Sequence, residues 1–498
     1  MQANSSVADF TPGTPVLVGV AAVQQKVADF HQALEPLALM EQALHDAAAD
    51  AGNTALLARA GEILVPKGIW GYSDPGRLLA SAVAASQAVS VLAEIGVSQQ
   101  TLISRACQRI ASGEIEVALV VGGEAKYRSL CASKAGSEAL ETAQSDSEPD
   151  VMLLPDAELW SEVESAAGLG MPVGYYAIMD SALRYKQGLS PDEHRDQMAA
   201  MYARFSAIAA SNPDAWSEQE VDAKTIREHS SANRMLAFPY TKLHNSQWNV
   251  DQSAALILCS AAVAQELGIA RSKWIFPRAT AESNFMSVVA SRGDLGACAG
   301  FQQAGQAVMA AAGISFDAIR LRELYSCFPY AVRSQLHEFA MTPGGDVSVT
   351  GGMTFAGGPL NNFVFQATVK MAQLLRSQPN EMGLVTTVSG MLTKQACALW
   401  SAQSGADGWS YSDVTEQVRA TTDVREIVAD YQGDGRVVGY TVLYQGDDPW
   451  RAVAVFDLPG GQRTVAYSEN AQLMQSMLER EFCGQACSLA DGRFNWGQ

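Results

Sequence analysis

An alternation of short apolar runs with amphipathic segments occurs twice along this chain and is the feature that most constrains its fold. In the first half, residues 16–23 (VLVGVAAV) predict a buried strand and residues 37–49 a helix that ends near Gly52. In the second half, a helix over 300–312 precedes a strand over 319–324. Parallel strands need long crossover connections, which are usually helices. The order therefore predicts an α/β fold whose parallel-rich, helix-covered sheet is built twice.

A turn of small residues before a helix also recurs in both halves. Ser98 is placed to cap a helix over 98–110. In the second half, TGGMTFAGGPLNN (350–362) carries two glycine pairs, and its proline leads into a helix over 359–375. Paired glycines let a ligand approach the backbone, and a helix N-terminus can hold an anionic or carbonyl oxygen. A tight turn that binds nothing is the alternative, and the spacing alone leaves both open.

Two regions depart from this repeat. Residues 124–240 read as a largely helical insertion, and after about residue 405 short strands separated by Gly and Asp turns predict a β-rich domain. We therefore expect three parts: a first half over 14–270 that contains the insertion, a second half over 271–404, and a small domain over 405–498.

Composition and charge limit the partners. The 498 residues carry a formal net charge of -19, which disfavours a nucleic-acid backbone as the main partner but leaves anionic cofactors possible at a local site. No apolar run is long enough to span a membrane, and the N-terminus lacks the pattern of a signal peptide. The eight cysteines are scattered without metal-ligand spacing. We expect a cytoplasmic protein with reduced thiols and no metal site.

Several blocks of the sequence resemble the thiolase superfamily. The resemblance is strongest to its thiolase-like type 1, acetyl-CoA acetyltransferase-like branch, which has an additional C-terminal domain, and it covers residues 14–490. The blocks that carry it are VALVVGGEAKY (117–127), TKLHNSQWNVDQ (241–252), ELYSCFP (323–329), GGMTFAGGPLNN (351–362) and VSGMLTKQA (388–396).

The resemblance implies a fold, a ligand and a place for that ligand. Thiolases contain two similar halves in a layered α-β-α-β-α core, with an inserted loop domain that covers coenzyme A. An acyl-CoA would reach the junction of the halves, where two central helices point their N-termini at the thioester and stabilise an oxyanion. The resemblance also implies a role in lipid metabolism, no permanently bound cofactor, and either a homodimer through the core or a monomer.

The first two catalytic motifs of thiolases are altered in this chain. The Cys-Gly-Ser block before the first central helix corresponds to VLAEIGVSQQ (91–100), which has no cysteine. Ser98 lies near the position of the nucleophile, but no adjacent base is evident, so we favour an N-cap role for it. The catalytic Gly-His-Pro has become Gly-Gly-Pro, which leaves position Gly358 without a side chain.

The other two motifs are altered as well. The third reads Tyr-Ser-Cys-Phe, with Tyr325 in place of the hydrogen-bonding residue and with Cys327 as either a relocated nucleophile or an inert buried thiol. The fourth, TTVSGMLTKQA (386–396), has no cysteine before Cys397, which we place in a following helix. Claisen condensation needs a nucleophile, a base and a second acid/base group, so we expect standard thiolase chemistry to be absent.

The motifs supply the candidate site residues. The catalytic positions are Ser98, Tyr325, Cys327 and Gly358. The candidate contacts for coenzyme A are Gly352, Gly357, Gly358, Lys242, Lys394 and Arg184.

Three functions remain open from the sequence. The first is a protein that binds coenzyme A or an acyl-CoA and has weak or altered acyltransferase activity. The second is an active acyltransferase or thioesterase with a relocated nucleophile. The third is a non-catalytic adaptor subunit that uses its C-terminal domain to contact another protein.

Overall fold

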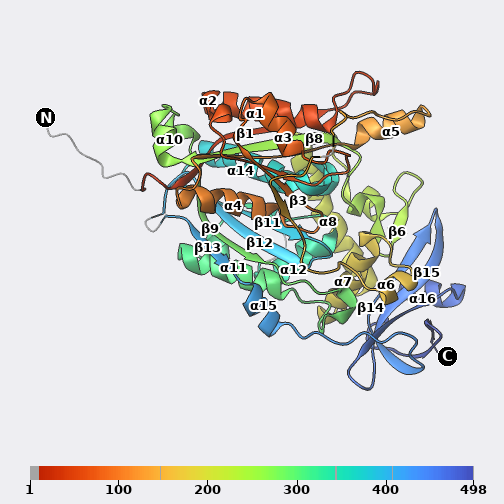
Figure 1. The fold of residues 1–498 in the computed structure, drawn as a ribbon. Helices are drawn as coiled ribbons and strands as arrows, with labels where there is room; N and C mark the ends of the chain where they lie inside the picture. Colours follow the sequence, from red (N-terminus) through yellow and green to blue (C-terminus); the bar gives the residue numbers. More distant parts are fainter. Residues whose placement is uncertain (1–9, 146, 342–344, 406–407, 497–498) are drawn as a thin grey trace.

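The structure is a computed structural model that describes residues 10–145, 147–341, 345–405 and 408–496. Its core has five layers in the order helix, sheet, helix, sheet, helix (Figure 1). A β-rich region lies at one end of this core and contains the C-terminal strands. The layered α/β fold expected from the sequence is confirmed.

The first core sheet contains the strands of the N-terminal half. A strand of the insertion, β5, pairs in parallel with β3 and forms one edge of this sheet. In spatial order the strands are β1 (Pro15–Gln25), β8 (Asp251–Ser260), β4 (Val117–Ala125), β2 (Glu62–Pro66), β3 (Val89–Ala93) and β5 (Val151–Leu153).

The second core sheet repeats the arrangement of the first. The series β9-β12-β11-β10 matches β1-β8-β4-β2 both in order and in the direction of each pairing. Both sheets are more antiparallel than we predicted, because the second strand of each series runs antiparallel to both of its neighbours. In spatial order the strands are β10 (Leu321–Glu323), β11 (Met382–Ser389), β12 (Lys394–Ser401), β9 (Phe276–Ser283) and β13 (Ser410–Asp413).

Two helices lie between the sheets and others cover the outer faces (Figure 1). The middle layer needs helices that are apolar on more than one side. The second central helix meets this condition, since its first three residues, 363–365, are all buried. The central helices are α4 (Gln99–Ala111) and α14 (Phe363–Ser377), and the outer ones include α1 (Pro36–Ala51), α3 (Pro75–Ala82), α11 (Ala299–Ala312) and α12 (Pro329–Glu338).

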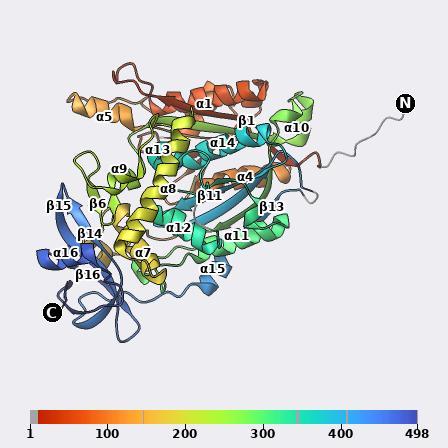
Figure 2. The same ribbon diagram turned by 180° about the vertical axis from the view of Figure 1, so that it is seen from behind.

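The insertion is largely helical, as predicted. Its longest helix, α8, begins with a capping box formed by Ser190 and Glu193 and runs beside the short helix α13 of the glycine loop (Figure 2). Its elements are α5 (Lys126–Lys134), α6 (Glu162–Ala166), α7 (Pro172–Lys186), α8 (Pro191–Ser211), α9 (Ala223–Arg227), β6 (Met235–Ala237) and β7 (Tyr240–Thr241), while α2 (Ala55–Ala58), α10 (Ala261–Glu266) and α13 (Gly352–Phe355) lie in the two halves.

The C-terminal strands close into a ring, because β14 pairs with both β15 and β17. Around the ring the strands are β14 (Gly433–Gln445), β15 (Asp448–Asp457), β16 (Arg463–Ser468), β18 (Arg493–Asn495) and β17 (Ala486–Ala490), with α16 (Ala471–Glu479) packed beside them. We call this region the C-terminal barrel.

The structure moves two boundaries of the expected parts. The strand β13 pairs with β9 in the second core sheet, and α15 (Thr415–Thr421) packs on α11, so the core continues past residue 405. Strand β6 of the insertion pairs with β14, which makes the insertion and the C-terminal barrel share one sheet. The expected position of Cys397 in a helix was wrong: this residue lies in strand β12, paired with Thr386.

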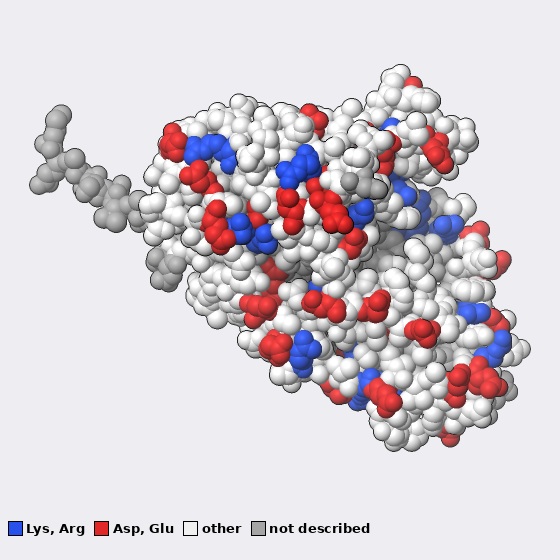
Figure 3. All heavy atoms as spheres, viewed as in Figure 1, with Lys and Arg blue, Asp and Glu red and all other residues white. Residues whose placement is uncertain are grey.

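Charged side chains are scattered over the surface among a larger number of uncharged residues. On the face shown in Figure 3, acidic and basic side chains are interleaved across both halves. In the described part of the chain, no helix combines the length and the apolar character that crossing a bilayer requires.

Candidate active site at the junction of the two halves

The first central helix begins at the junction with an unpartnered hydroxyl. Ser98 occupies the N-cap position of α4, as predicted, but its side chain makes no capping hydrogen bond. The residue is 2% exposed, and its Oγ has no hydrogen-bond partner among the described residues. Buried hydroxyls are nearly always paired, so this one is an exception that needs an explanation.

The second central helix is closed by a side chain from the first. Gln99 Oε1 accepts a hydrogen bond of 2.8 Å from the backbone N–H of Val364, in the first turn of α14. Tyr325 lies beside this contact, with its ring edge-on to Phe363 at 5.9 Å. One of the backbone amides at the start of α14 is therefore already occupied.

The glycine loop is tightly packed, with backbone angles that favour glycine. Gly357 has φ +104°, and a Cβ there would lie 2.1 Å from Gln252 Oε1. Gly352 has φ +71° and abuts Phe205 of α8. At Gly358 a Cβ would lie 3.0 Å from that of Ser246. Packing alone accounts for the tight turn, and a role of these glycines in ligand binding stays a prediction.

Cys327 lacks the surroundings of an activated thiol. Burial raises the pKa of this half-buried thiol to about 12, and the groups that act on it are Tyr176 and backbone amides rather than a base. A nucleophilic cysteine needs a lowered pKa or an adjacent base. The structure therefore favours the inert thiol over the relocated nucleophile.

Lys394 is a buried cation beside the first turn of α4. It is 2% exposed, and its Nζ has no hydrogen bond or ion pair within the described ranges. It pairs across the β11–β12 hairpin with Ser389, whose Oγ donates to the carbonyl of Val97 at 3.3 Å. Burial lowers the pKa of Lys394, an effect that Asp156 and Glu282 oppose.

Glu282 links this lysine to the central helix. Its carboxylate accepts hydrogen bonds from Thr101 at 2.6 Å and from Ser104, both on α4. Burial raises the pKa of Glu282. Through Ser389 and Glu282, Lys394 is thus connected to the N-terminal part of α4, where Ser98 lies.

Three solved structures resemble the chain over most of its length. A monomeric SCP2-thiolase-like protein type 1 from Mycobacterium smegmatis is 24% identical, with a TM-score of 0.82 over 98% of this chain and 100% of that one. The dimeric peroxisomal thiolase of Saccharomyces cerevisiae is 17% identical, with a TM-score of 0.56 over 79% and 98%. Human mitochondrial 3-ketoacyl-CoA thiolase in complex with CoA is 15% identical, with a TM-score of 0.55 over 79% and 99%. This protein has the thiolase fold.

No protein-family model matches the sequence, and no curated protein matches it either. The likeness of structure agrees with the resemblance that the motifs predicted. The Mycobacterium smegmatis protein matches nearly the whole chain, whereas the thiolases leave about a fifth of it uncovered, since each covers 79%.

Within the thiolase fold, a segment of the insertion lies over the junction. A Cβ on Gly390 would lie 2.7 Å from the side chain of Leu159, so these two residues are in close contact. The side chain of Pro155 likewise packs directly against Gly96. Trp160 continues this segment and is 49% exposed. Entry to the start of α4 is therefore bordered by residues 155–160.

Two predicted contacts for coenzyme A differ in exposure, and the contact through Lys242 stays a prediction. Lys242 is exposed at the end of the insertion. Arg184 is fully buried and is held by Glu481 at 2.9 Å and by the hydroxyl of Tyr440 at 2.8 Å, both from the C-terminal region. Its guanidinium is enclosed by these partners, so the structure gives Arg184 an internal role in place of the predicted phosphate contact.

Sequence reasoning missed a buried polar cluster beneath α8. Asp180 accepts hydrogen bonds from Tyr240 at 2.6 Å and from Arg333 at 2.9 Å, and lies 3.2 Å from His194. Burial lowers the pKa of His194 to about 4. The four residues are spread over more than 150 positions and four elements, so no local pattern marked them. Among the described residues, no group of His, Cys, Asp and Glu is arranged to hold a metal.

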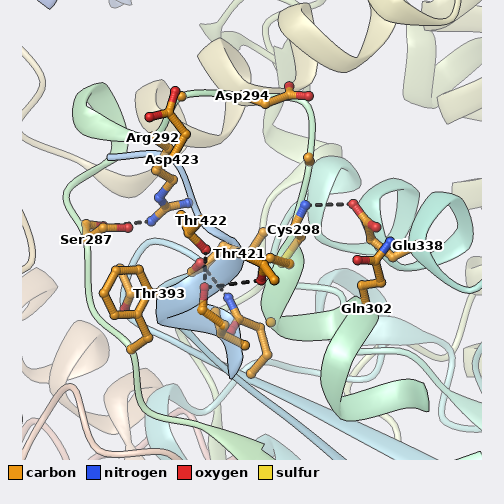
Figure 4. Close-up of a pocket in the computed structure, with 18 of the residues that line it drawn as sticks. Ser287, Arg292, Asp294, Cys298, Gln302, Glu338, Thr393, Thr421, Thr422 and Asp423 are labelled. Atoms are coloured by element: carbon orange, nitrogen blue, oxygen red, sulfur yellow. Dashed lines mark hydrogen bonds between the residues drawn. The ribbon is translucent and has the colours of Figure 1, made fainter. Parts of the chain in front are cut away.

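Two cavities have a volume of about 570 Å³ each, and the first reaches the β11–β12 hairpin at Leu392, Thr393 and Gln395. One lies between the start of α11 and α15 and includes Arg292 and Cys298 in its wall (Figure 4). The other lies between α8 and α12. Neither is lined by Ser98, Tyr325, Cys327 or Gly358.

Proposed function

We propose that this protein binds the thioester end of an acyl-CoA at the junction of its two halves and does not carry out thiolase chemistry. The observation that carries the proposal is a pair of polar groups near the start of α4. Ser98 Oγ is buried without a hydrogen-bond partner among the described residues, and Lys394, which is 2% exposed, forms no hydrogen bond or ion pair with them. Groups buried to this degree are nearly always satisfied, so a ligand oxygen that accepts from both is expected.

The choice of an acyl-CoA rests on the fold. One structural neighbour, the human mitochondrial thiolase, is described in complex with CoA. The carbonyl of a thioester is an acceptor that suits an ammonium, a hydroxyl and a helix N-terminus. Fold alone is a weak guide to function, so the proposal depends on the two unpartnered groups at the site.

Three observations support the absence of thiolase turnover. Position 358 carries no imidazole, and Ser246 leaves little room for a side chain there. The Cys327 thiol has a raised pKa and no base. Gln99 occupies the first turn of α14. For the same reasons, an acyltransferase or thioesterase with a relocated nucleophile has less support, and nothing in the fold favours an adaptor subunit.

Calorimetric titration of acetyl-CoA, and separately of free coenzyme A, into the full-length protein tests the proposal. We expect acetyl-CoA to bind with a Kd on the order of micromolar, which is about -8 kcal/mol. The Lys394→Met variant should weaken binding about tenfold, equal to about 1.4 kcal/mol. Lys186→Met is the matched control, because Lys186 is exposed and its charge is paired with Asp294.

Two results would overturn the proposal. The first is the absence of binding at millimolar acetyl-CoA. The second is robust thiolysis of acetoacetyl-CoA by the unaltered protein, since this would require a nucleophile and base that the junction lacks. A Ser98→Ala variant with wild-type affinity would restrict the ligand contact to Lys394.

A further inference from the structure

The C-terminal barrel contacts the core through the buried guanidinium of Arg463. Arg463 of β16 is 1% exposed and is anchored in the barrel by Asp457 at 2.7 Å. Its other nitrogens donate to the carbonyls of Ala290, Arg292 and Gly293, the last at 2.7 Å. A guanidinium offers five donors in a fixed fork, so it can hold several carbonyls of one turn at once.

The turn that Arg463 holds, residues 287–293, is fastened from two further sides. The buried carboxylate of Glu164 in α6 accepts from the backbone N–H of Ala290 at 2.8 Å. The segment before the barrel completes the attachment, because the backbone N–H of Gly293 donates to the carbonyl of Asp423 at 2.8 Å. The insertion and the C-terminal region therefore converge on one turn of the second half.

Arg292, a residue of this turn, forms hydrogen bonds that connect the turn to the candidate site. It is 7% exposed, and no carboxylate of a described residue lies within ion-pair distance of it. Its Nη2 donates to the carbonyl of Ser287 at 3.1 Å (Figure 4). The same Nη2 donates to the carbonyl of Met391 at 2.6 Å. Met391 belongs to the β11–β12 turn, which connects Ser389 to Lys394.

The β11–β12 turn is itself a wall of the junction. Ser389 bonds to the carbonyl of Val97, next to Ser98, and Gly390 accepts from the hydroxyl of Tyr176 at 3.4 Å. Hydrogen bonds joined by short stretches of backbone thus connect Arg463 through the 287–293 turn and Arg292 to the β11–β12 turn and the start of α4.

We propose that Arg463 and Arg292 are positioning residues for the candidate site, so that the C-terminal barrel sets the conformation of the β11–β12 turn. The link to ligand affinity rests on the proposed function, whereas the link between the barrel and the turn does not. The barrel then contributes to the conformation of the site and is not an independent module.

Hydrogen exchange of the full-length protein, followed by mass spectrometry, tests this coupling. In Arg463→Ala, peptides over 286–294 should exchange faster, and so should peptides over 387–395, which Arg463 does not touch. Arg463→Lys should restore part of the protection, because an ammonium keeps the charge but cannot bridge all the carbonyls. Arg493→Ala is the matched control, since Arg493 is a 54% exposed arginine of the same barrel that pairs with Glu469.

A second variant separates positioning from loss of the fold. Arg292→Met should speed exchange over 387–395 while peptides of β15 keep wild-type protection. Unchanged exchange over 387–395 in both Arg463→Ala and Arg292→Met would overturn the proposal. Faster exchange of β15 in Arg463→Ala would show that the barrel had opened. The exchange of peptides over 387–395 in Arg292→Met and Arg463→Lys would then decide whether the coupling exists.

Titration of acetyl-CoA into the same variants completes the test. We expect both Arg463→Ala and Arg292→Met to weaken binding several-fold, and Arg493→Ala to leave it unchanged. If acetyl-CoA fails to bind even the wild-type protein, the proposed function fails, while the exchange result still decides the coupling. Wild-type affinity in both variants would show that the turn does not position the site.

Discussion

Gln99 Oε1 lies 2.8 Å from the backbone nitrogen of Val364, so a side chain of the first central helix closes the N-terminus of the second. The contact joins the two halves at the place where the proposed function puts the thioester oxygen. The hydrogen bond stabilises the junction but uses a backbone N–H that could otherwise donate to an oxyanion. An acyl-transfer site needs such free donors more than a binding site does.

Truncation of this side chain should destabilise the protein. In Gln99→Ala the buried N–H of Val364 loses its partner, which costs about 1–3 kcal/mol. Chemical denaturation should show a free energy of unfolding lower by that amount. Gln108→Ala, at an exposed position of the same helix, should change the free energy of unfolding by less than about 0.5 kcal/mol. Equal effects of the two substitutions would contradict the role of Gln99.

Restoring the missing catalytic side chains should not restore catalysis. We expect Ser98→Cys combined with Gly358→His to show no acetoacetyl-CoA thiolysis above background, because Gln99 still closes α14 and Ser246 crowds position 358. Spectrophotometric detection of thioester cleavage measures this. Turnover by the double variant would show that the scaffold had kept a competent oxyanion site.

Two glycines of positive φ should differ sharply in their tolerance of alanine. Gly357→Ala places a Cβ 2.1 Å from Gln252 Oε1 and should lower the free energy of unfolding by about 2–4 kcal/mol. Gly313→Ala, at the end of α11, meets no atom within 4 Å and should cost only about 1–2 kcal/mol for its backbone conformation. Thermal unfolding of both variants measures the difference, and similar losses would refute the packing argument.

Buried His194 should make stability depend on pH. Burial lowers its pKa from 6.5 to about 4 in the folded protein, so between these values the unfolded chain binds more protons. The free energy of unfolding should therefore fall as the pH decreases from 6.5 toward 4. His194→Gln stays neutral and should flatten this dependence, whereas His45→Gln, at an exposed position of α1, should not. The same slope in both variants would assign the effect to other groups.

The edge strand β5 leads to a prediction about assembly. It pairs with the outer side of β3 from Val91 to Ala93 and so covers the edge of the first sheet that another copy could otherwise extend. We expect a monomer in solution. Light scattering after size exclusion measures the mass, and a stable dimer would mean that the subunits meet on a different surface.

Much of the fold could be predicted because its signals are local. The buried run at β1, the helix that ends near Gly52 and the turn of small residues before each central helix all depend on neighbouring residues. Short or fully buried strands were harder. The run KQACALWS of β12 is buried on both faces, so periodicity cannot distinguish it from a buried helix, and Cys397 was misplaced for this reason.

The candidate site was predictable only in part. The motifs located Ser98 and Lys394. The hydrogen bond from Val364 to Gln99 joins positions far apart in the chain, and so does the ion pair between Arg184 and Glu481. Such contacts depend on how distant elements pack, and a single sequence carries no local mark of them.

The pairing of Ala237 with Leu443 has a consequence for how the chain is made. Strand β6 leaves the ribosome long before β14. The edge of β6 that pairs with β14 therefore stays unpaired while the second half is synthesised. Contacts between such distant residues form slowly, and an exposed strand edge invites association with other chains. Premature termination before residue 443 would leave that edge permanently open, so shortened products should aggregate or engage chaperones although both halves of the core are present.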